Sequence, residues 1–334
     1  MGHRQLTSAK LFRRILFCSI LLALSLTLAV LLGSNTVNFS GALEQNGIDR
    51  EVLLLLRLPR ALMAALAGGA LAVTGVLFQA LLRNPLAEPY TLGISGGAAL
   101  GAVAAISFGW STLAGFSAVS AAAFLGAALV LLTIWQVTSR QGISSNSILL
   151  AGIAMNCICA ALILFLSSIA TFLQSFAITR WLIGSIGSPN YLTLVQVTCI
   201  VIPLFVLTWH FARSWNVLAI GEEWASSRGV PAKKFLIIGC VIGSVVAATV
   251  TAYTGPIGFV GLIVPNALRL KLGADHRILV PCSFLLGGAF LVLSDLVSRI
   301  VLRPTEIPVG VITALIGGPV LIWMLYSGQA NYRA

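Results

Sequence analysis

Ten apolar stretches of this sequence are candidates to cross a membrane as helices, and the eighth of them is short. Such a helix needs about 20 mostly apolar residues, because the hydrocarbon core offers the backbone no water. Charged residues make up 9% of the chain, whereas soluble domains carry about 25%. We expect an all-α integral membrane protein with about ten spans, forming one membrane domain over residues 1–334. The expected spans are 13–33, 58–80, 91–109, 113–137, 146–168, 191–212, 235–254, 257–272, 278–298 and 309–326.

Two segments need separate interpretation. Residues 13–33 begin with a pair of arginines, Arg13 and Arg14, as a signal peptide would. Their apolar core is longer than the usual ~7–15 residues, and no Ala-x-Ala cleavage site follows, so we interpret them as the first span. Residues 169–190 contain Arg180, Trp181, two glycines and Pro189. This composition favours a partial or interfacial helix over a full span.

The basic residues predict the orientation of the chain. With a cytoplasmic N-terminus, fourteen of the 20 Lys and Arg residues lie on the cytoplasmic side and six on the outer side. This excess predicts that both termini are cytoplasmic, with residues 1–12 as an N-terminal tail. The net charge of +11 is spread over short loops instead of forming a stripe, so we expect no nucleic-acid partner. The six outer residues are Arg50, Arg57, Arg60, Arg180, Arg299 and Arg303.

The order of the spans suggests an inverted repeat. Spans two to five start from the outside and spans seven to ten from the inside, which is a common transporter architecture. Small residues four apart also predict helix contact faces, because they let backbones approach closely in lipid. These faces are Gly93/Gly97/Gly101, Ala64/Gly68/Ala72 and Gly239/Gly243/Ala247.

The spans hold almost no groups that could carry chemistry. Asp295 stands four residues before Arg299, a spacing that predicts a local ion pair. The sequence has no catalytic triad, paired carboxylates or P-loop, and its six cysteines fall inside apolar runs without metal-ligand spacing. We expect no catalytic site, metal or cofactor on this chain. An ion-driven secondary carrier stays open as the alternative class, although such carriers use intramembrane acids.

The segment 213–234 is the most polar part of the second half of the chain. Glu222 and Glu223 begin a short helical pattern and Arg228 ends it, an order that complements the helix dipole. Gly229 suits the position after a helix, and Pro231 prevents its continuation. We therefore expect a short helix at the cytoplasmic surface that binds a partner, and a solvated connector is the alternative.

Several ordered motifs resemble the permease subunits of the iron-siderophore, haem and cobalamin class of ABC importers (the FecCD type). The resemblance covers residues 50–326. Its motifs are Leu56–Arg60, Gln79 with Arg83–Pro89, Leu92–Ser95, Leu150–Gly152, Gly221–Gly229, Gly255–Pro265, Asp275–Arg277, Asp295 with Arg299, and Pro304–Gly310.

The resemblance implies the fold and partners of a type II ABC importer permease. Such a permease forms a homodimer in the cytoplasmic (inner) membrane. Two ATPase subunits bind its cytoplasmic face, and a substrate-binding protein binds its outer face. ATP hydrolysis would occur on the separate ATPase, so this chain would be a transport subunit and no enzyme. An iron-siderophore chelate is the expected cargo, moved by ATP-driven alternating access, with cobalamin or haem as alternatives.

The resemblance also assigns residues to roles. Many relatives have a histidine after the Val-Pro pair, where this chain has Asn266, a residue that hydrogen-bonds but does not titrate near neutral pH. The matching ATPase-coupling residues are Gly221, Glu222, Glu223, Ala225, Arg228 and Gly229; those docking the binding protein are Arg57, Arg60 and Arg299; those of the cytoplasmic gate are Asn84, Leu86, Ser145 and Asn146; and those lining the pathway are Met155 and Asn156.

Overall fold

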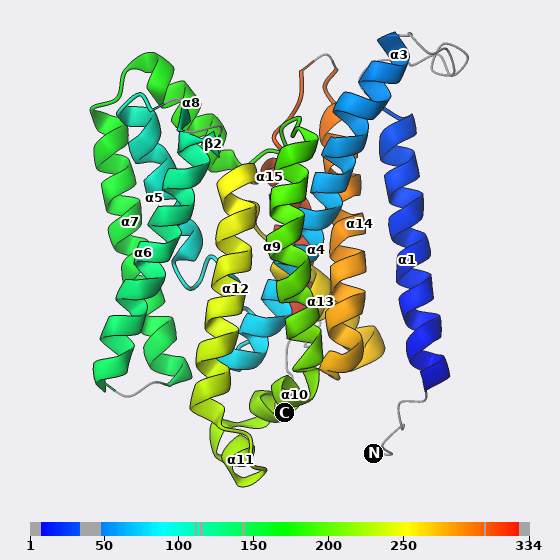
Figure 1. Ribbon diagram of the computed structural model, residues 1–334, viewed down its shortest axis with the longest axis vertical. Coiled ribbons are helices and arrows are strands. Elements are labelled where there is room, and N and C mark those ends of the chain that lie inside the picture. The colour runs from blue at the N-terminus through cyan, green and yellow to red at the C-terminus, as the bar shows by residue number, and fades with distance from the viewer. Residues whose placement is uncertain are drawn as a thin grey trace.

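Long helices that stand side by side make up almost all of the molecule (Figure 1). The computed structural model describes residues 8–33, 48–110, 112–113, 116–141, 144–303 and 305–326. The elements of the first half are α1 (Ser8–Leu31), α3 (Ile48–Glu51), the π-helix η1 (Val52–Arg57), α4 (Leu58–Leu82), α5 (Ile94–Ser107), β1 (Thr112–Leu113), β2 (Phe116–Ser117), α6 (Ala118–Gln141) and α7 (Ser145–Ser168). Those of the second half are α8 (Phe172–Ile183), α9 (Tyr191–His210), α10 (Ala212–Ile220), α11 (Glu222–Ser227), α12 (Ala232–Thr254), α13 (Val260–Leu272), α14 (His276–Ile300) and α15 (Val309–Tyr326).

Each expected span contains a helix, and the all-α fold is confirmed. Within the described residues, seven helices are long and apolar enough to cross a membrane. Helices α5 and α13 are shorter, with 14 and 13 residues, and the apolar stretch of α15, Val309–Met324, is also shorter than these seven. The count of ten spans therefore stays a prediction.

Several boundaries differ from the expected ones. Helix α1 begins at Ser8, inside the predicted tail 1–12, and residues 1–7 of that tail lie outside the described residues. Strands β1 and β2 pair in antiparallel fashion where the span 113–137 was expected to start, so α6 begins only at Ala118. Strands of two residues are too short to leave an alternating pattern in a sequence. The segment 169–190 contains the expected partial helix, α8, which Thr171 and Gln174 cap.

Helix α4 lies at the centre of the bundle. Its span is 89% buried, whereas the span of α1 is 17% buried and packs at the edge against α14 (Figure 1). The predicted small-residue faces are confirmed as contact faces: Gly68 meets Gly287 of α14, and Gly97 and Gly101 meet α6. Backbone-to-backbone contact of this kind lets dispersion forces hold helices together inside lipid.

The short helices α5 and α13 begin in a similar way. A broken loop follows the long helix α4 before α5, and another follows α12 before α13. Left-handed residues stand directly before both short helices, Gly93 with φ 72° and Phe259 with φ 70°. At Gly93 a side chain would also press on the carbonyl oxygen of Gly152. This shared pattern fits the predicted inverted repeat, which stays a prediction.

Candidate functional site

The expected surface helix is present as α11, which projects beyond the other helices at one end of the molecule (Figure 1). Its first turn carries Glu222 and Glu223. It ends as expected: Gly229 has a left-handed φ of 76°, and Val230 donates its backbone N–H to the carbonyl oxygen of Ala225. Pro231 then stands at the start of α12.

A second helix in the same segment, α10, was not expected. It buries Ala212, Trp215 and Leu218, and the Trp215 indole donates to the carbonyl oxygen of Thr208 at 2.9 Å. The spacing of three residues among these buried side chains was the signal in the sequence. Because these residues directly follow an apolar span, the sequence alone does not separate this helix from the polar connector.

Asn216 on α10 fixes this helix to the start of α14. Its Nδ2 donates to Asp275 Oδ1 at 2.9 Å, and its Oδ1 accepts the backbone N–H of His276 at 2.8 Å. Burial raises the pKa of the Asp275 carboxyl, but hydrogen bonds from Arg277 and Asn216 outweigh it and hold that pKa below its usual value. Helix α10, which contacts α11, is therefore held in place by the start of α14.

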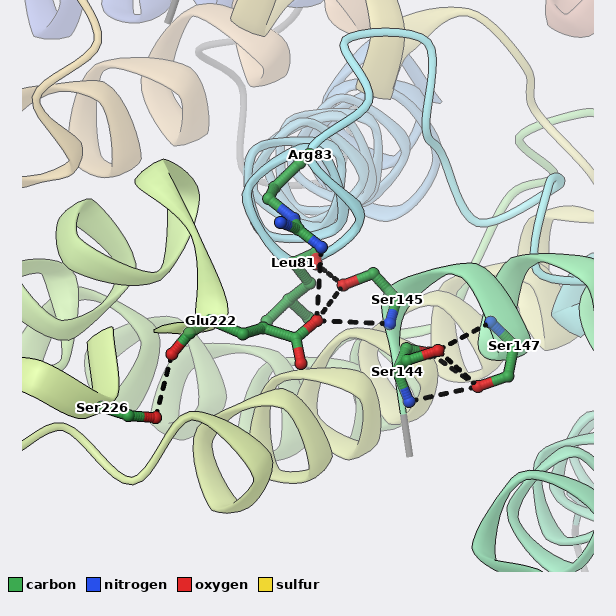
Figure 2. Close-up of polar contacts among 7 residues, drawn as sticks. All are labelled: Leu81, Arg83, Ser144, Ser145, Ser147, Glu222 and Ser226. Carbon is green, nitrogen blue, oxygen red and sulfur yellow. Dashed lines mark hydrogen bonds and ion pairs between the residues drawn. The ribbon is translucent and has the colours of Figure 1, made fainter. Parts of the chain in front are cut away.

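Glu222 connects α11 directly to two long helices (Figure 2). Its Oε1 accepts the Ser145 hydroxyl at 2.9 Å and lies 3.4 Å from the Ser145 backbone nitrogen, at the start of α7. The same oxygen lies 3.4 Å from Nη2 of Arg83, at the end of α4. One carboxylate thus touches the ends of α4, α7 and α11.

Ser145 is the buried member of this cluster, with 2% of its surface exposed. Its hydroxyl also lies 2.8 Å from the carbonyl oxygen of Leu81 (Figure 2). A hydroxyl has one proton, so it donates to Leu81 or to Glu222 at any moment. Ser144 and Ser147 form a capping box at this helix start, which fixes the backbone around Ser145.

The structure brings the four predicted gate residues to this same end. Asn84 and Leu86 follow Arg83, and Asn84 Oδ1 accepts the Leu86 backbone N–H at 3.0 Å. Ser145 and Asn146 begin α7, where Asn146 is exposed. The gate assignment stays a prediction, but these residues stand next to the Glu222 contacts.

The loop after α4 is held from its other side by α13. Asn266 Nδ2 donates to the Pro85 carbonyl oxygen at 3.0 Å, and Arg269 donates to Asn266 Oδ1 at 3.1 Å. The pKa of the Glu88 carboxyl is raised to about 7, because burial raises it by more than the hydrogen bond from the Phe259 backbone N–H lowers it. The Asn266 amide therefore joins α13 to this loop at Pro85.

The predicted pathway residues lie on the middle of α7. Met155 is partly buried and Asn156 is exposed. Both lie where Gly93 and Gly96 of the α5 start approach α7: a side chain at Gly96 would contact Asn156 Oδ1. Their role as pathway residues stays a prediction.

The three predicted docking arginines lie towards the opposite end, and each has a partner in its own chain. Arg57 donates to the carbonyl oxygens of Val30 and Leu31 at 3.1 Å. Arg60 pairs with Asp295 and Glu306, both at 2.9 Å. The predicted pair between Asp295 and Arg299 is confirmed at 3.0 Å. Arg57 and Arg299 are 6% and 4% exposed, so their docking role stays a prediction.

Comparison with known proteins decides the family. The profile described as the FecCD transport family matches residues 21–327. The chain belongs to the FecCD transport family. This membership confirms the resemblance seen in the motifs and identifies a multi-pass membrane permease subunit of an ABC importer, which is a transport component and no enzyme.

Similar FecCD-family proteins cover most of the chain. The hemin transport system permease protein HmuU of Yersinia pestis is 37% identical over 278 residues, which span 82% of this chain and 83% of that protein. The cobalamin import system permease protein BtuC of Halobacterium salinarum is 38% identical over 277 residues, covering 83% and 73%. A solved metal-chelate type ABC transporter in an inward-facing conformation aligns with a TM-score of 0.81 and 28% identity, covering 95% of this chain and 99% of that one.

Proposed function

We propose that this permease moves an iron-siderophore chelate across the inner membrane by ATP-driven alternating access, with α11 as the contact for a separate ATPase subunit. In this proposal the α11 end and both termini are cytoplasmic. The permease works as a homodimer with two ATPase subunits, and a substrate-binding protein delivers the chelate to the opposite face. Haem and cobalamin are the alternative cargoes, since similar proteins are named for hemin and cobalamin transport.

The contact made by Glu222 carries this proposal. Its carboxylate joins α11 to the start of α7 and the end of α4. A displacement of α11 would therefore pull directly on the helix ends that carry the predicted gate residues, such as Ser145 and Asn84. A local element with two arrangements, biased by both sites, is a physical explanation for coupling between distant sites. The Ser145 hydroxyl, which can donate its proton to Leu81 or to Glu222, supports such an explanation.

Uptake into proteoliposomes tests the energy source and the cargo together. The purified permease–ATPase complex is reconstituted with ATP inside, and the binding protein is added outside with a labelled ferric siderophore, haemin or cyanocobalamin. We expect uptake of one of these with ATP inside, none with ADP, and no effect of a protonophore. Uptake that needs no ATP and collapses with the protonophore would identify an ion-driven carrier instead.

A further inference from the structure

A cavity of about 630 Å³ opens at the end of the molecule away from α11. It lies between the last turns of α8, the following segment 185–188 and the segment 305–309 before α15; α8 is at the upper end in Figure 1. Ligand pockets measure about 300–1,000 Å³ and are mostly apolar with a few polar groups. This cavity combines apolar walls, including Phe176 and Ile307, with hydroxyl groups and charged side chains.

Two arginines line the cavity, and within the described residues only Arg60 of these two forms ion pairs. Arg60 in the wall is engaged by Asp295 and Glu306. Arg180, in the last turn of α8, is exposed and has no hydrogen bond or ion pair within the described part of the chain. A basic residue at a helix end also complements the helix dipole, so the test must separate that effect from ligand binding.

The floor of the cavity is fixed in place. The Ser185 backbone N–H donates to the Thr254 carbonyl oxygen at 2.8 Å, and that of Gly310 donates to the Gly184 carbonyl oxygen at 3.2 Å. Gly184 has a φ of 76°, and a side chain there would overlap the carbonyl oxygen of Pro256. The loop that presents Ser185 and Ser188 therefore keeps its shape, which reduces the ordering cost of binding.

We infer that this outer cavity receives a metal chelate that carries a carboxylate, with the Arg180 guanidinium as its anion contact. A guanidinium presents a planar fork that pairs with a carboxylate through two hydrogen bonds. The apolar walls take the body of the chelate, and Arg60 stays in its own ion pairs. This inference rests on the proposed function and names its substrate class: carboxylate-bearing chelates over uncharged ones.

Haemin and its dimethyl ester form a suitable probe pair, because they share one metal and ring and differ in two carboxylates. Equilibrium binding of each is measured by absorbance titration to the full-length permease–ATPase complex in nanodiscs without ATP. Arg180→Gln, Arg180→Lys and a control are compared, after size-exclusion profiles and melting temperatures show that each complex is folded. The control is Arg13→Gln, which removes an exposed arginine of α1 far from the cavity.

Wild-type complex is expected to bind haemin more tightly than the ester. Arg180→Gln is expected to weaken haemin binding by about tenfold, the lower end of the range for a lost charge-assisted hydrogen bond, and to leave ester binding unchanged. Arg180→Lys retains part of the preference, and Arg13→Gln retains all of it. Equal binding of the two probes by the wild type, or equal weakening of both by Arg180→Gln, would overturn the inference. Because no ATP is present, these outcomes are independent of a failure of ATP-driven uptake.

Discussion

Glu222→Arg is expected to lower ATP-driven uptake at least about tenfold while the permease stays folded and the ATPase still hydrolyses ATP. The substitution removes the acceptor of the buried Ser145 hydroxyl and places a second cation beside Arg83. The ion pair with Arg83 is half exposed and contributes little alone. A hydrogen bond from a buried group to a charged one is worth about 1.5–3 kcal/mol, or roughly ten- to hundredfold. Uptake and phosphate release are measured together in proteoliposomes.

Two further variants separate the internal contact from docking of the ATPase. Glu223→Arg makes the same charge change one residue along the helix, on an exposed side chain that forms no hydrogen bond or ion pair with Ser145 or Arg83 in the described structure, and is expected to cost less uptake. Arg83→Glu in the Glu222→Arg background restores opposite charges and is expected to recover part of the uptake. If Glu222→Arg behaves like Glu223→Arg and Arg83→Glu recovers nothing, the contact has no part in coupling.

Gly75→Ala is expected to remove most of the folded permease from the membrane. A Cβ atom at this position would overlap the carbonyl group of Gly261, so α4 and α13 would have to move apart. The same carbonyl oxygen accepts a buried hydrogen bond from Gln79 Nε2 at 3.0 Å, which the movement would also break. Overpacking costs about 1–3 kcal/mol or more, and the unpaired amide adds to it. The yield and melting temperature of the purified permease measure the loss.

Gly318→Ala is the matched control for this effect. It adds the same methyl group to a glycine inside α15, where a Cβ atom would have nothing within 4 Å. We expect its yield and melting temperature to equal those of the wild type. A Gly75→Ala permease as abundant and as stable as Gly318→Ala would contradict the close approach of α4 and α13.

Local features of the segment 213–234 could be predicted from the sequence. Two acids followed by a glycine and a proline were enough to place α11, because helix ends depend on neighbouring residues. The partner of Glu222 could not be predicted, since Ser145 is 77 residues away. No local pattern tells which helix end will meet this carboxylate.

The sequence predicted which helix faces make close contacts, but not which helices they contact. Small residues four apart identified the contact faces, yet the sequence does not say that Gly68 faces Gly287. The arginines show the same limit. The family resemblance suggested docking residues on the outer face, but the carbonyl oxygens that bind Arg57 belong to α1, and one aspartate, Asp295, pairs with both Arg60 and Arg299.

The most direct test of the central claim is to identify what touches α11 in the native membrane. A photoreactive amino acid replaces Trp224, which is 48% exposed on α11, or Leu129, which is 64% exposed on α6. After irradiation the tagged chain is purified and its cross-linked partners are sequenced. We expect an ATP-binding ATPase subunit to be joined at position 224 and not at position 129. An ATPase that is absent at position 224, or joined equally at both positions, would contradict the assignment of α11 as the coupling contact.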